Sequence, residues 1–288
     1  MAGPSTPSRF IHGSFRLAFV FLLGQRRGEL VGTTGIRKLL AATDGSEAGE
    51  HAVRVAEAIA REAGAEFEVL GVETAGLPAF ASVGEPVART ESSRRITWVR
   101  GIPGVEIVRR AEEYGADLVV LGRRERPPQG FLGSGRTADG VVRRRGGACL
   151  LVPPTVGKLD RMVIALDGTR RGLGILEPAA ALAAAVRGQV TAVCVVPDHG
   201  PDGAESPEGC ASRVGEALGQ YPALGGPGIL RCRKGRPVPE IMAQLEETGA
   251  NLLVLGVRRG GPSGEMGSGH VGQDLLREAP VAILTVPI

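Results

Sequence analysis

The chain has 288 residues, of which 43% are hydrophobic and only 3% are aromatic, and its formal net charge is +3. This length suits one large or two medium domains, whose cores must be aliphatic because aromatic side chains are scarce. The small net charge argues against a dedicated nucleic-acid-binding protein. We also predict no membrane partner, because the apolar run at residues 17–23 is far shorter than the roughly 20 residues of a spanning helix.

Residues 1–35 differ from the rest of the chain. Their apolar run follows basic residues, but residues 25–27 (QRR) stand where a signal peptide would have a small-residue cleavage site. We interpret this segment as an N-terminal extension that is disordered or that reflects a start codon assigned too early. A weak signal peptide is the alternative. The folded part is expected to begin near Ile36.

From residue 37 onward, short apolar runs alternate with segments whose apolar residues recur at helical spacing. Apolar runs of this kind are typical of strands buried on both faces of a parallel sheet. Gly64 ends one expected helix and Pro103 begins another. Residues 74–95 are expected to be a loop with at most a short helix. The expected strands cover residues 39–43, 67–72, 96–99, 116–122 and 148–152, and the expected helices cover 47–63, a segment from 103 onward and part of 135–145.

The same series of elements returns after a linker at residues 153–158. The run ADLVVLG at 116–122 recurs as ANLLVLG at 250–256, 134 positions later, whereas Asp44 and Asp167 lie 123 positions apart. The second copy therefore has 11 extra residues (134 minus 123) before its third strand, which we interpret as a loop insertion. We predict two domains, 36–154 and 155–288. The expected strands of the second copy cover residues 162–166, 190–196, 229–232, 250–256 and 281–286; its expected helices end near 188 and cover 210–218 and 237–247, and residues 197–209 are expected to be a polar loop.

Alternating strands and helices predict an α/β fold with a parallel, doubly wound sheet. Sheets of this class bind ligands beyond the carboxyl ends of their strands. Asp44 and Asp167 follow the first strand of each copy, and a carboxylate there can accept hydrogen bonds from a sugar or a base. A glycine-containing loop follows each fourth strand, and its backbone N–H groups can bind phosphate where it enters a helix. The alternative is that both aspartates simply cap the helices that follow.

The four cysteines, at positions 149, 194, 210 and 232, form no CxxC pair. We interpret them as small buried apolar residues in a reducing compartment, which predicts a cytoplasmic protein. The four histidines are scattered and lack the spacing of metal ligands, so no metal site is predicted.

The layout resembles a tandem universal stress protein, over residues 37–288. This resemblance implies two Rossmann-like domains of the adenine nucleotide alpha hydrolase-like type, each with a five-stranded parallel sheet in the order 3-2-1-4-5. It also implies pairing through the fifth strands, which can be internal here, with a homodimer as a further option. The motifs that carry it are LAATDGS (40–46), GIP (101–103), ADLVVLG (116–122) and CLLVP (149–153) in the first copy, and IALDGT (164–169) and APVAIL (279–284) in the second.

Some members of this family bind ATP, with magnesium, through a loop of the form G-x2-G-x9-G-[S/T], and others lack the loop and bind none. In register with the fifth strand, the outer glycines are kept in both copies, but Glu125 and Arg259 replace the middle glycine. Arg136 and His270 replace the serine or threonine. Sliding the loop by two residues would restore a Gly-Ser pair in each copy, but it breaks the spacing.

The charged residues of these loops would have opposite effects on phosphate binding. Glu125 would repel a phosphate, whereas the neighbouring arginines at 123, 124, 136, 258 and 259 would attract one. The second copy is favoured because its loop has no acidic residue before Glu265. By resemblance, Val72 and Val195 would contact adenine through their backbone. The candidate nucleotide-binding residues are Asp44, Val72, Gly122, Arg123, Gly135, Arg136, Asp167, Val195, Gly256, Gly269 and His270.

We therefore predict a stress-response protein that binds ATP or another adenine nucleotide. An enzyme such as an ATP hydrolase is disfavoured, because the sequence shows no general base, nucleophile or metal cluster near the loops. The alternative is a nucleotide-free regulatory or scaffold module that acts through protein contacts, which the replaced loop residues support.

Overall fold

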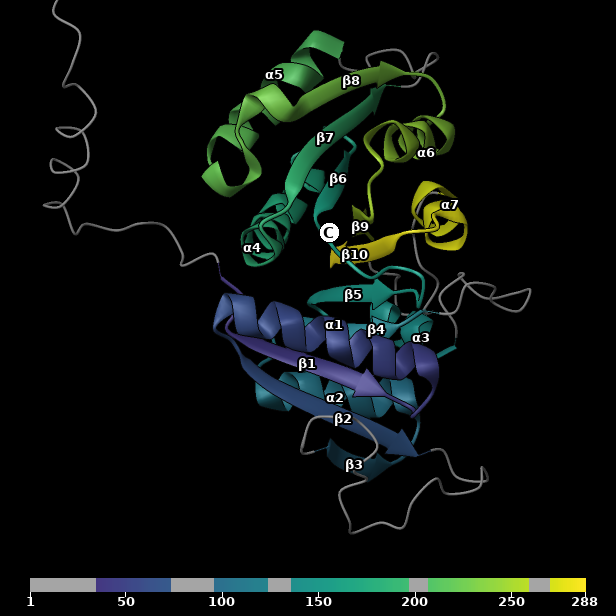
Figure 1. Ribbon diagram of the computed structural model, residues 1–288. Helices are drawn as coiled ribbons and strands as arrows, with labels where there is room; N and C mark the ends of the chain where they lie inside the picture. Colours follow the sequence, from purple (N-terminus) through teal and green to yellow (C-terminus); the bar gives the residue numbers. More distant parts are fainter. Residues whose placement is uncertain (1–34, 74–95, 124–135, 197–206, 259–269) are drawn as a thin grey trace, which may run out of the picture. The chain divides into compact units, whose positions relative to one another are not determined.

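The computed structural model describes residues 35–73, 96–123, 136–196, 207–258 and 270–288 (Figure 1). The predictions for the N-terminal extension, Gly35 apart, and for residues 74–95 lie outside these ranges. Among the helices within them, none is long and apolar enough to cross a bilayer.

Each half of the chain forms five strands with intervening helices. The first half contains β1 (Lys38–Thr43), α1 (Glu47–Ala63), β2 (Glu66–Glu73), β3 (Ile96–Arg100), α2 (Pro103–Tyr114), β4 (Leu118–Gly122), α3 (Arg136–Arg144) and β5 (Ala148–Val152). The second half contains β6 (Arg161–Leu166), the short 3-10 helix η1 (Gly172–Ile175), α4 (Leu176–Val186), β7 (Gln189–Val196), α5 (Pro207–Gly219), the short 3-10 helices η2 (Pro222–Leu224) and η3 (Pro227–Ile229), β8 (Leu230–Lys234), α6 (Pro237–Thr248), β9 (Leu252–Val257), α7 (His270–Glu278) and β10 (Ala282–Pro287).

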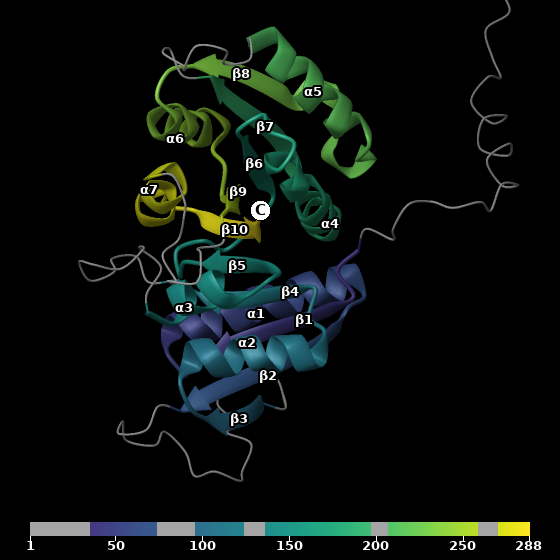
Figure 2. The ribbon, with the colours of Figure 1, turned by 180° about the vertical axis from the view of Figure 1, so that it is seen from behind.

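The strands form one ten-stranded sheet in the order β3-β2-β1-β4-β5-β10-β9-β6-β7-β8. Within each half the strands are parallel and follow the order 3-2-1-4-5, so the predicted fold class is confirmed. The halves meet where β5 and β10 lie side by side (Figures 1 and 2). The two strands pair in antiparallel fashion, with Leu150 opposite Leu284. The predicted pairing of fifth strands is therefore present inside the chain.

Successive residues of the central strands serve two different cores. In β1, Leu39 packs with α1 on one face and Leu40 packs with α2 on the other, and both side chains are fully buried. Burial of one leucine side chain stabilises the fold by roughly 1.5–3 kcal/mol. Because helices cover both faces of the sheet, most residues of the central strands are buried, and the strand sequences are continuous apolar runs. The first core contains residues of α1, α4 and α5, and the second contains residues of α2, α3, α6 and α7.

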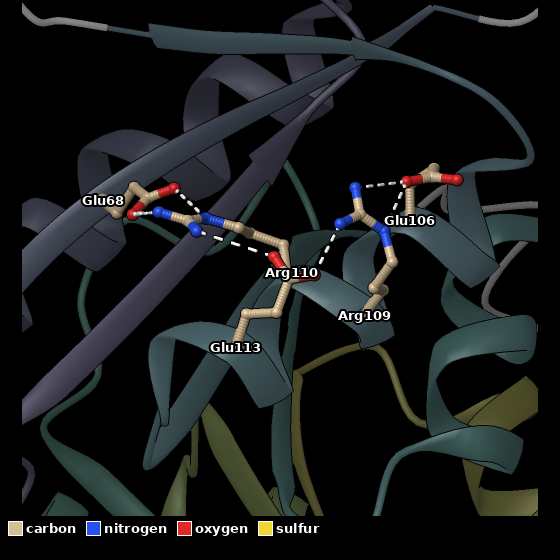
Figure 3. A network of polar contacts seen from close by, with 5 residues as sticks. All are labelled: Glu68, Glu106, Arg109, Arg110 and Glu113. Carbon is tan, nitrogen blue, oxygen red and sulfur yellow. Dashed lines mark hydrogen bonds and ion pairs between the residues drawn. The ribbon is translucent and has the colours of Figure 1, made fainter.

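An ion-pair network holds α2 against β2 (Figure 3). Arg110 of α2 donates two hydrogen bonds to the carboxylate of Glu68 on β2, at 2.7 and 2.6 Å. On the same helix, Arg109 pairs with Glu106 at 2.8 Å and with Glu113 at 2.6 Å. The two parallel hydrogen bonds of the Arg110–Glu68 pair add a directional contact to the apolar packing of Ile107 and Ala111 of α2 against the sheet.

The insertion in the second half lies between β7 and β8. These strands are separated by 33 residues, against 22 between β2 and β3, so the difference is the 11 residues expected from the sequence offsets (33 minus 22). The described part of this segment holds α5, η2 and η3. The polar loop predicted for residues 197–209 is wrong at its end, because α5 already begins at Pro207.

Candidate functional site

The chain makes a tight turn directly after β1, and Asp44 holds it. The Oδ1 atom of Asp44 accepts hydrogen bonds from the backbone N–H and the hydroxyl of Ser46, at 3.0 and 2.5 Å. Gly45 adopts φ +76°, a left-handed conformation that glycine enters without steric cost. The Ser46 hydroxyl then accepts a hydrogen bond from the N–H of Gly49 at 3.2 Å and caps α1.

The same turn recurs after β6. The Oδ1 atom of Asp167 accepts from the N–H of Thr169 at 2.9 Å and from its hydroxyl at 2.8 Å, and Gly168 has φ +71°. The Thr169 hydroxyl accepts from the N–H of Gly172 at 2.9 Å. The alternative that the aspartates are helix caps is therefore wrong, because Ser46 is the N-cap of α1 in the first half and Arg171 stands at the N-cap position of η1 in the second.

In each of these carboxylates, one of the two oxygen atoms takes no part in the turn. Asp44 and Asp167 are both exposed. Their Oδ1 atoms are engaged in the turns, whereas their Oδ2 atoms accept no hydrogen bond from the part of the chain that the structure describes. A carboxylate oxygen in this position can accept a hydrogen bond from a ligand hydroxyl or amino group without disturbing the turn.

Gly122 brings the end of β4 close to the Asp44 turn. A Cβ atom at Gly122 would lie 2.6 Å from the carbonyl oxygen of Ala48 and 2.9 Å from the N–H nitrogen of Gly49. Gly49 in turn approaches Asp44, since a Cβ atom there would lie 3.0 Å from the Asp44 Oδ1 atom. The end of the fourth strand and the first-strand aspartate therefore lie side by side, as predicted.

Gly256 occupies the matching place in the second half. A Cβ atom at Gly256 would lie 2.8 Å from the Cδ1 atom of Ile288, so its neighbour is a flexible side chain rather than backbone. Gly172 again approaches the aspartate, because a Cβ atom there would overlap the Asp167 Oδ1 atom. Both halves thus bring a first-strand aspartate and a fourth-strand glycine to the carboxyl edge of the sheet.

The surroundings of the first aspartate are acidic. Glu47 and Glu50 lie in the first turn of α1, directly after the capped turn. The Thr43 hydroxyl is buried and donates a hydrogen bond to the Glu50 carboxylate at 3.1 Å. Acidic residues stabilise a helix N-terminus, but they disfavour an anionic ligand at the same place.

The surroundings of the second aspartate are basic and apolar. At an offset of 123 positions, Arg170 replaces Glu47 and is exposed. Leu166 and Leu173 replace the Thr43–Glu50 pair. The two halves therefore share the hydrogen-bonded turn after the first strand, but α1 follows it in the first half and the 3-10 helix η1 in the second, and the nearby charges differ in sign.

Arg123, predicted to attract phosphate, serves the junction between the halves instead. Its guanidinium is buried and donates hydrogen bonds to the carbonyl oxygens of Leu276 (2.8 Å), Ala279 (2.7 Å) and Val281 (3.0 Å), at and just beyond the end of α7. Burial lowers the pKa of Arg123 to about 10, so it stays charged at neutral pH. The prediction was wrong because both terminal nitrogens of this guanidinium already donate to carbonyl oxygens at the C-terminus of α7, and only its Nε atom has no hydrogen-bond partner among the described residues.

The remaining candidates are only partly within the described residues. Val72 is buried near the end of β2, and Val195 is half-buried near the end of β7. Arg136 and His270 begin α3 and α7, although the structure does not describe their side chains. Gly135, Gly269 and the loop residues 124–134 and 259–268 lie outside the described residues, so the nucleotide loops themselves stay predictions.

Three of the cysteines gather beside the Asp167 turn, which sequence reasoning missed. Cys194 and Cys210 are buried as predicted, and so is Cys149 elsewhere in the sheet, but Cys232 is exposed and that part of the prediction was wrong. The copy offset could have revealed part of the cluster, because Cys194 and Cys232 align with two residues that pair in the first half. Within the described ranges, no group of histidine, cysteine and acidic side chains is arranged to hold a metal ion.

Comparisons with known proteins place the two halves in one family. The sequence model of the universal stress protein family matches residues 84–153 and 158–287. No curated protein matches the chain. Among solved structures, a universal stress protein from Archaeoglobus fulgidus DSM 4304 is 20% identical, with 87% of this chain and 98% of that chain covered and a TM-score of 0.62. A functionally unknown protein from Pseudomonas aeruginosa PAO1 is 16% identical, with 88% and 93% covered and a TM-score of 0.62. A universal stress protein in complex with cAMP is 20% identical and covers only 46% of this chain and 98% of its own, with a TM-score of 0.35.

Proposed function

We infer that this chain, which belongs to the universal stress protein family, binds an adenine nucleotide such as ATP in its second half. The proposed site lies at the carboxyl ends of β6 and β9, with Asp167 and Gly256 at its centre. Val195, Gly269 and His270 stay predictions from the sequence as further contacts. The observation that carries the proposal is the change of charge between two turns of the same geometry.

A nucleotide carries its charge in its phosphates, so the sign of the nearest side chains matters. One unit charge about 8 Å from a phosphate contributes roughly 0.5–2 kcal/mol, depending on how much water lies between them. Glu47 and Glu50 would oppose binding at the first turn, whereas Arg170 and the exposed Arg258 after β9 would favour binding at the second. A guanidinium also offers several N–H donors in a planar fork that suits phosphate oxygens.

Asp167 would supply the polar contact to the sugar. Its Oδ1 atom is fixed by Thr169, so the orientation of the carboxylate is set before a ligand arrives. Its Oδ2 atom would then accept a hydrogen bond from a ribose hydroxyl. Pre-organisation of this kind lowers the entropic cost of binding, because the side chain does not have to be ordered by the ligand.

Isothermal titration of the full chain with ATP, with and without magnesium, tests the proposal. We expect one binding site per chain, and we expect Asp167→Asn to weaken binding at least about tenfold, the loss of one good hydrogen bond. Asparagine keeps the Oδ1 acceptor of the turn and replaces the Oδ2 atom by an amino group, so the turn should survive. Asp44→Asn is the matched control and should leave the affinity unchanged. Absence of heat at millimolar ATP, or an equal loss with both variants, would refute the proposal.

A nucleotide-free regulatory or scaffold module is the second candidate. It is favoured by Glu125 and Arg259 in place of the middle glycines, and by the use of Arg123 as a structural residue. Partners recovered by pull-down whose binding ignores ATP would support it, and size-exclusion chromatography would show whether the chain also forms a homodimer. Both candidate functions involve binding and no catalysis. The free thiols favour a reducing compartment, the cytoplasm, in either case.

A further inference from the structure

Three thiols lie together on one side of the sheet in the second half. Cys194 of β7 and Cys232 of β8 are register partners in parallel strands, so their side chains point to the same face. Cys210 of α5 covers that face, and its sulfur lies 2.6 Å from the sulfur of Cys194. Burial raises the pKa of the Cys232 thiol, and the neighbouring Cys210 raises it further.

The first half contains no such cluster at the matching positions. Cys194 and Cys232 correspond, at offsets of 123 and 134 positions, to Gly71 and Trp98, which are likewise register partners. There the indole ring lies directly over the glycine, and a Cβ atom at Gly71 would overlap it. One copy of the fold thus packs an aromatic ring on this face, and the other places thiols there.

We propose that Cys194 and Cys210 are a redox-active pair that closes to a reversible disulfide when a peroxide oxidises it. Sulfur atoms this close need only a small adjustment to reach the bond length of about 2.05 Å. The bond would link β7 to α5 across a separation of 16 positions. It would form in an otherwise reduced protein, as is usual for redox-sensing cysteines in a reducing compartment.

The chemistry balances with peroxide as the only oxidant. The sulfur of Cys210, which is 6% exposed against 1% for Cys194, attacks one peroxide oxygen, the O–O bond breaks, and a sulfenic acid and water result. The sulfur of Cys194 then attacks the sulfenic sulfur, the S–S bond forms, and the hydroxyl leaves with the thiol proton as a second water. Two thiols lose two electrons and the peroxide gains them. A small dithiol reverses the change by thiol–disulfide exchange.

The bond would act on the Asp167 turn through α5. Arg213 of α5 donates a hydrogen bond to the carbonyl oxygen of Gly168 at 2.6 Å. Gly168 also lies against the sulfur of Cys210, since a Cβ atom there would overlap that sulfur. Fixing Cys210 to β7 therefore fixes the helix that contacts the turn. This structural effect does not depend on whether a nucleotide binds.

Intact-mass and thiol measurements on the full chain test the proposal. The reduced protein is treated with hydrogen peroxide, and its thiols are then counted in denaturant. We expect the mass to fall by about 2 Da and two of the four thiols to disappear. Peptide mapping should show a link between Cys194 and Cys210, a dithiol should restore both thiols, and the oxidised protein should melt at a higher temperature.

Variants in which one cysteine is replaced by serine show whether the disulfide forms between Cys194 and Cys210 or between other cysteines. Cys232→Ser should still lose two thiols, whereas Cys210→Ser should form no bond between the remaining cysteines of the cluster. Should Cys210→Ser fail to fold, the peptide map of the wild-type protein decides alone. Retention of all four thiols at peroxide concentrations that oxidise a model dithiol would overturn the proposal, and so would a link that involves Cys149 or Cys232 or joins two chains.

Discussion

Arg123→Met tests whether the buried arginine holds the two halves together. The guanidinium donates three hydrogen bonds to carbonyl oxygens, at 2.7, 2.8 and 3.0 Å, and the side chain is 4% exposed. Hydrogen bonds to charged groups contribute roughly 1.5–3 kcal/mol each. Against this stands the cost of burying the charge, about 3 kcal/mol when the fall in pKa from 12.5 to about 10 is converted at 1.36 kcal/mol per unit.

The balance favours the wild-type residue. Methionine keeps much of the apolar stem but leaves three carbonyl oxygens without their donor, so we expect the free energy of unfolding to fall by about 2–4 kcal/mol. For a chain of this size the melting temperature should fall by roughly 4–8 °C. Urea unfolding followed by circular dichroism measures the change. Because the lost contacts lie at the end of α7, amide exchange in that helix should accelerate most.

Arg100→Met is the control for the loss of an arginine as such. Arg100 pairs with Glu73 at 3.2 Å, but its side chain is 70% exposed, so its removal should cost less than about 1 kcal/mol. If Arg123→Met unfolds within about 0.5 kcal/mol of the wild-type protein, or no more easily than Arg100→Met, then the carbonyl contacts do not hold the halves together and the argument fails.

Two further pairs of variants use the repeat as its own control. Gly122→Ala places a methyl group 2.6 Å from a backbone carbonyl oxygen of α1 and should cost about 2 kcal/mol or more. The three atoms nearest to a Cβ at Gly256 all belong to the flexible side chain of Ile288, so Gly256→Ala should cost less than about 1 kcal/mol. Equal costs in thermal melts would contradict this explanation. Asp117 accepts hydrogen bonds from the N–H groups of residues 37 and 38, at 2.8 and 2.9 Å, and Asn251 performs the same task at the start of β6. Asp117→Asn should therefore be close to neutral and Asp117→Ala should cost about 1–2 kcal/mol; the idea is wrong if the asparagine variant is the less stable of the two.

Much of the fold could be predicted because each local pattern agreed with its repeat. Apolar runs, helix-ending glycines and two constant offsets were enough to find each strand that the structure describes and to locate the insertion before β8. The aspartate turns were also found, although their hydrogen bonds were not. The directions in which individual side chains point could not be predicted. A sequence shows that Arg123 follows a glycine at a strand end, but not that its side chain turns toward the other half.

The cysteines show the same limit for contacts across elements. Cys194 and Cys210 are separated by a segment whose length gives no sign that α5 returns over β7, so their proximity follows from packing alone. The burial of Cys232 was predicted from its strand, but β8 is the last strand of the sheet and leaves that side chain exposed. The sequence of β8, LRCRK, holds three basic residues, which are typical of an edge strand and would have indicated this exposure.

The repeat also indicates which features depend on the backbone and which depend on the ligand. The Asp-Gly-Ser/Thr turn is kept in both halves with matching hydrogen bonds, because in each half it leads the chain from the first strand into the following helical segment. The side chains around it are not kept: Glu47 becomes Arg170, and the buried Thr43–Glu50 pair becomes two leucines. A constraint that came from folding alone would act equally on both turns. The difference in charge therefore indicates a difference in function between the two halves. For this reason we expect each chain to bind one nucleotide rather than two.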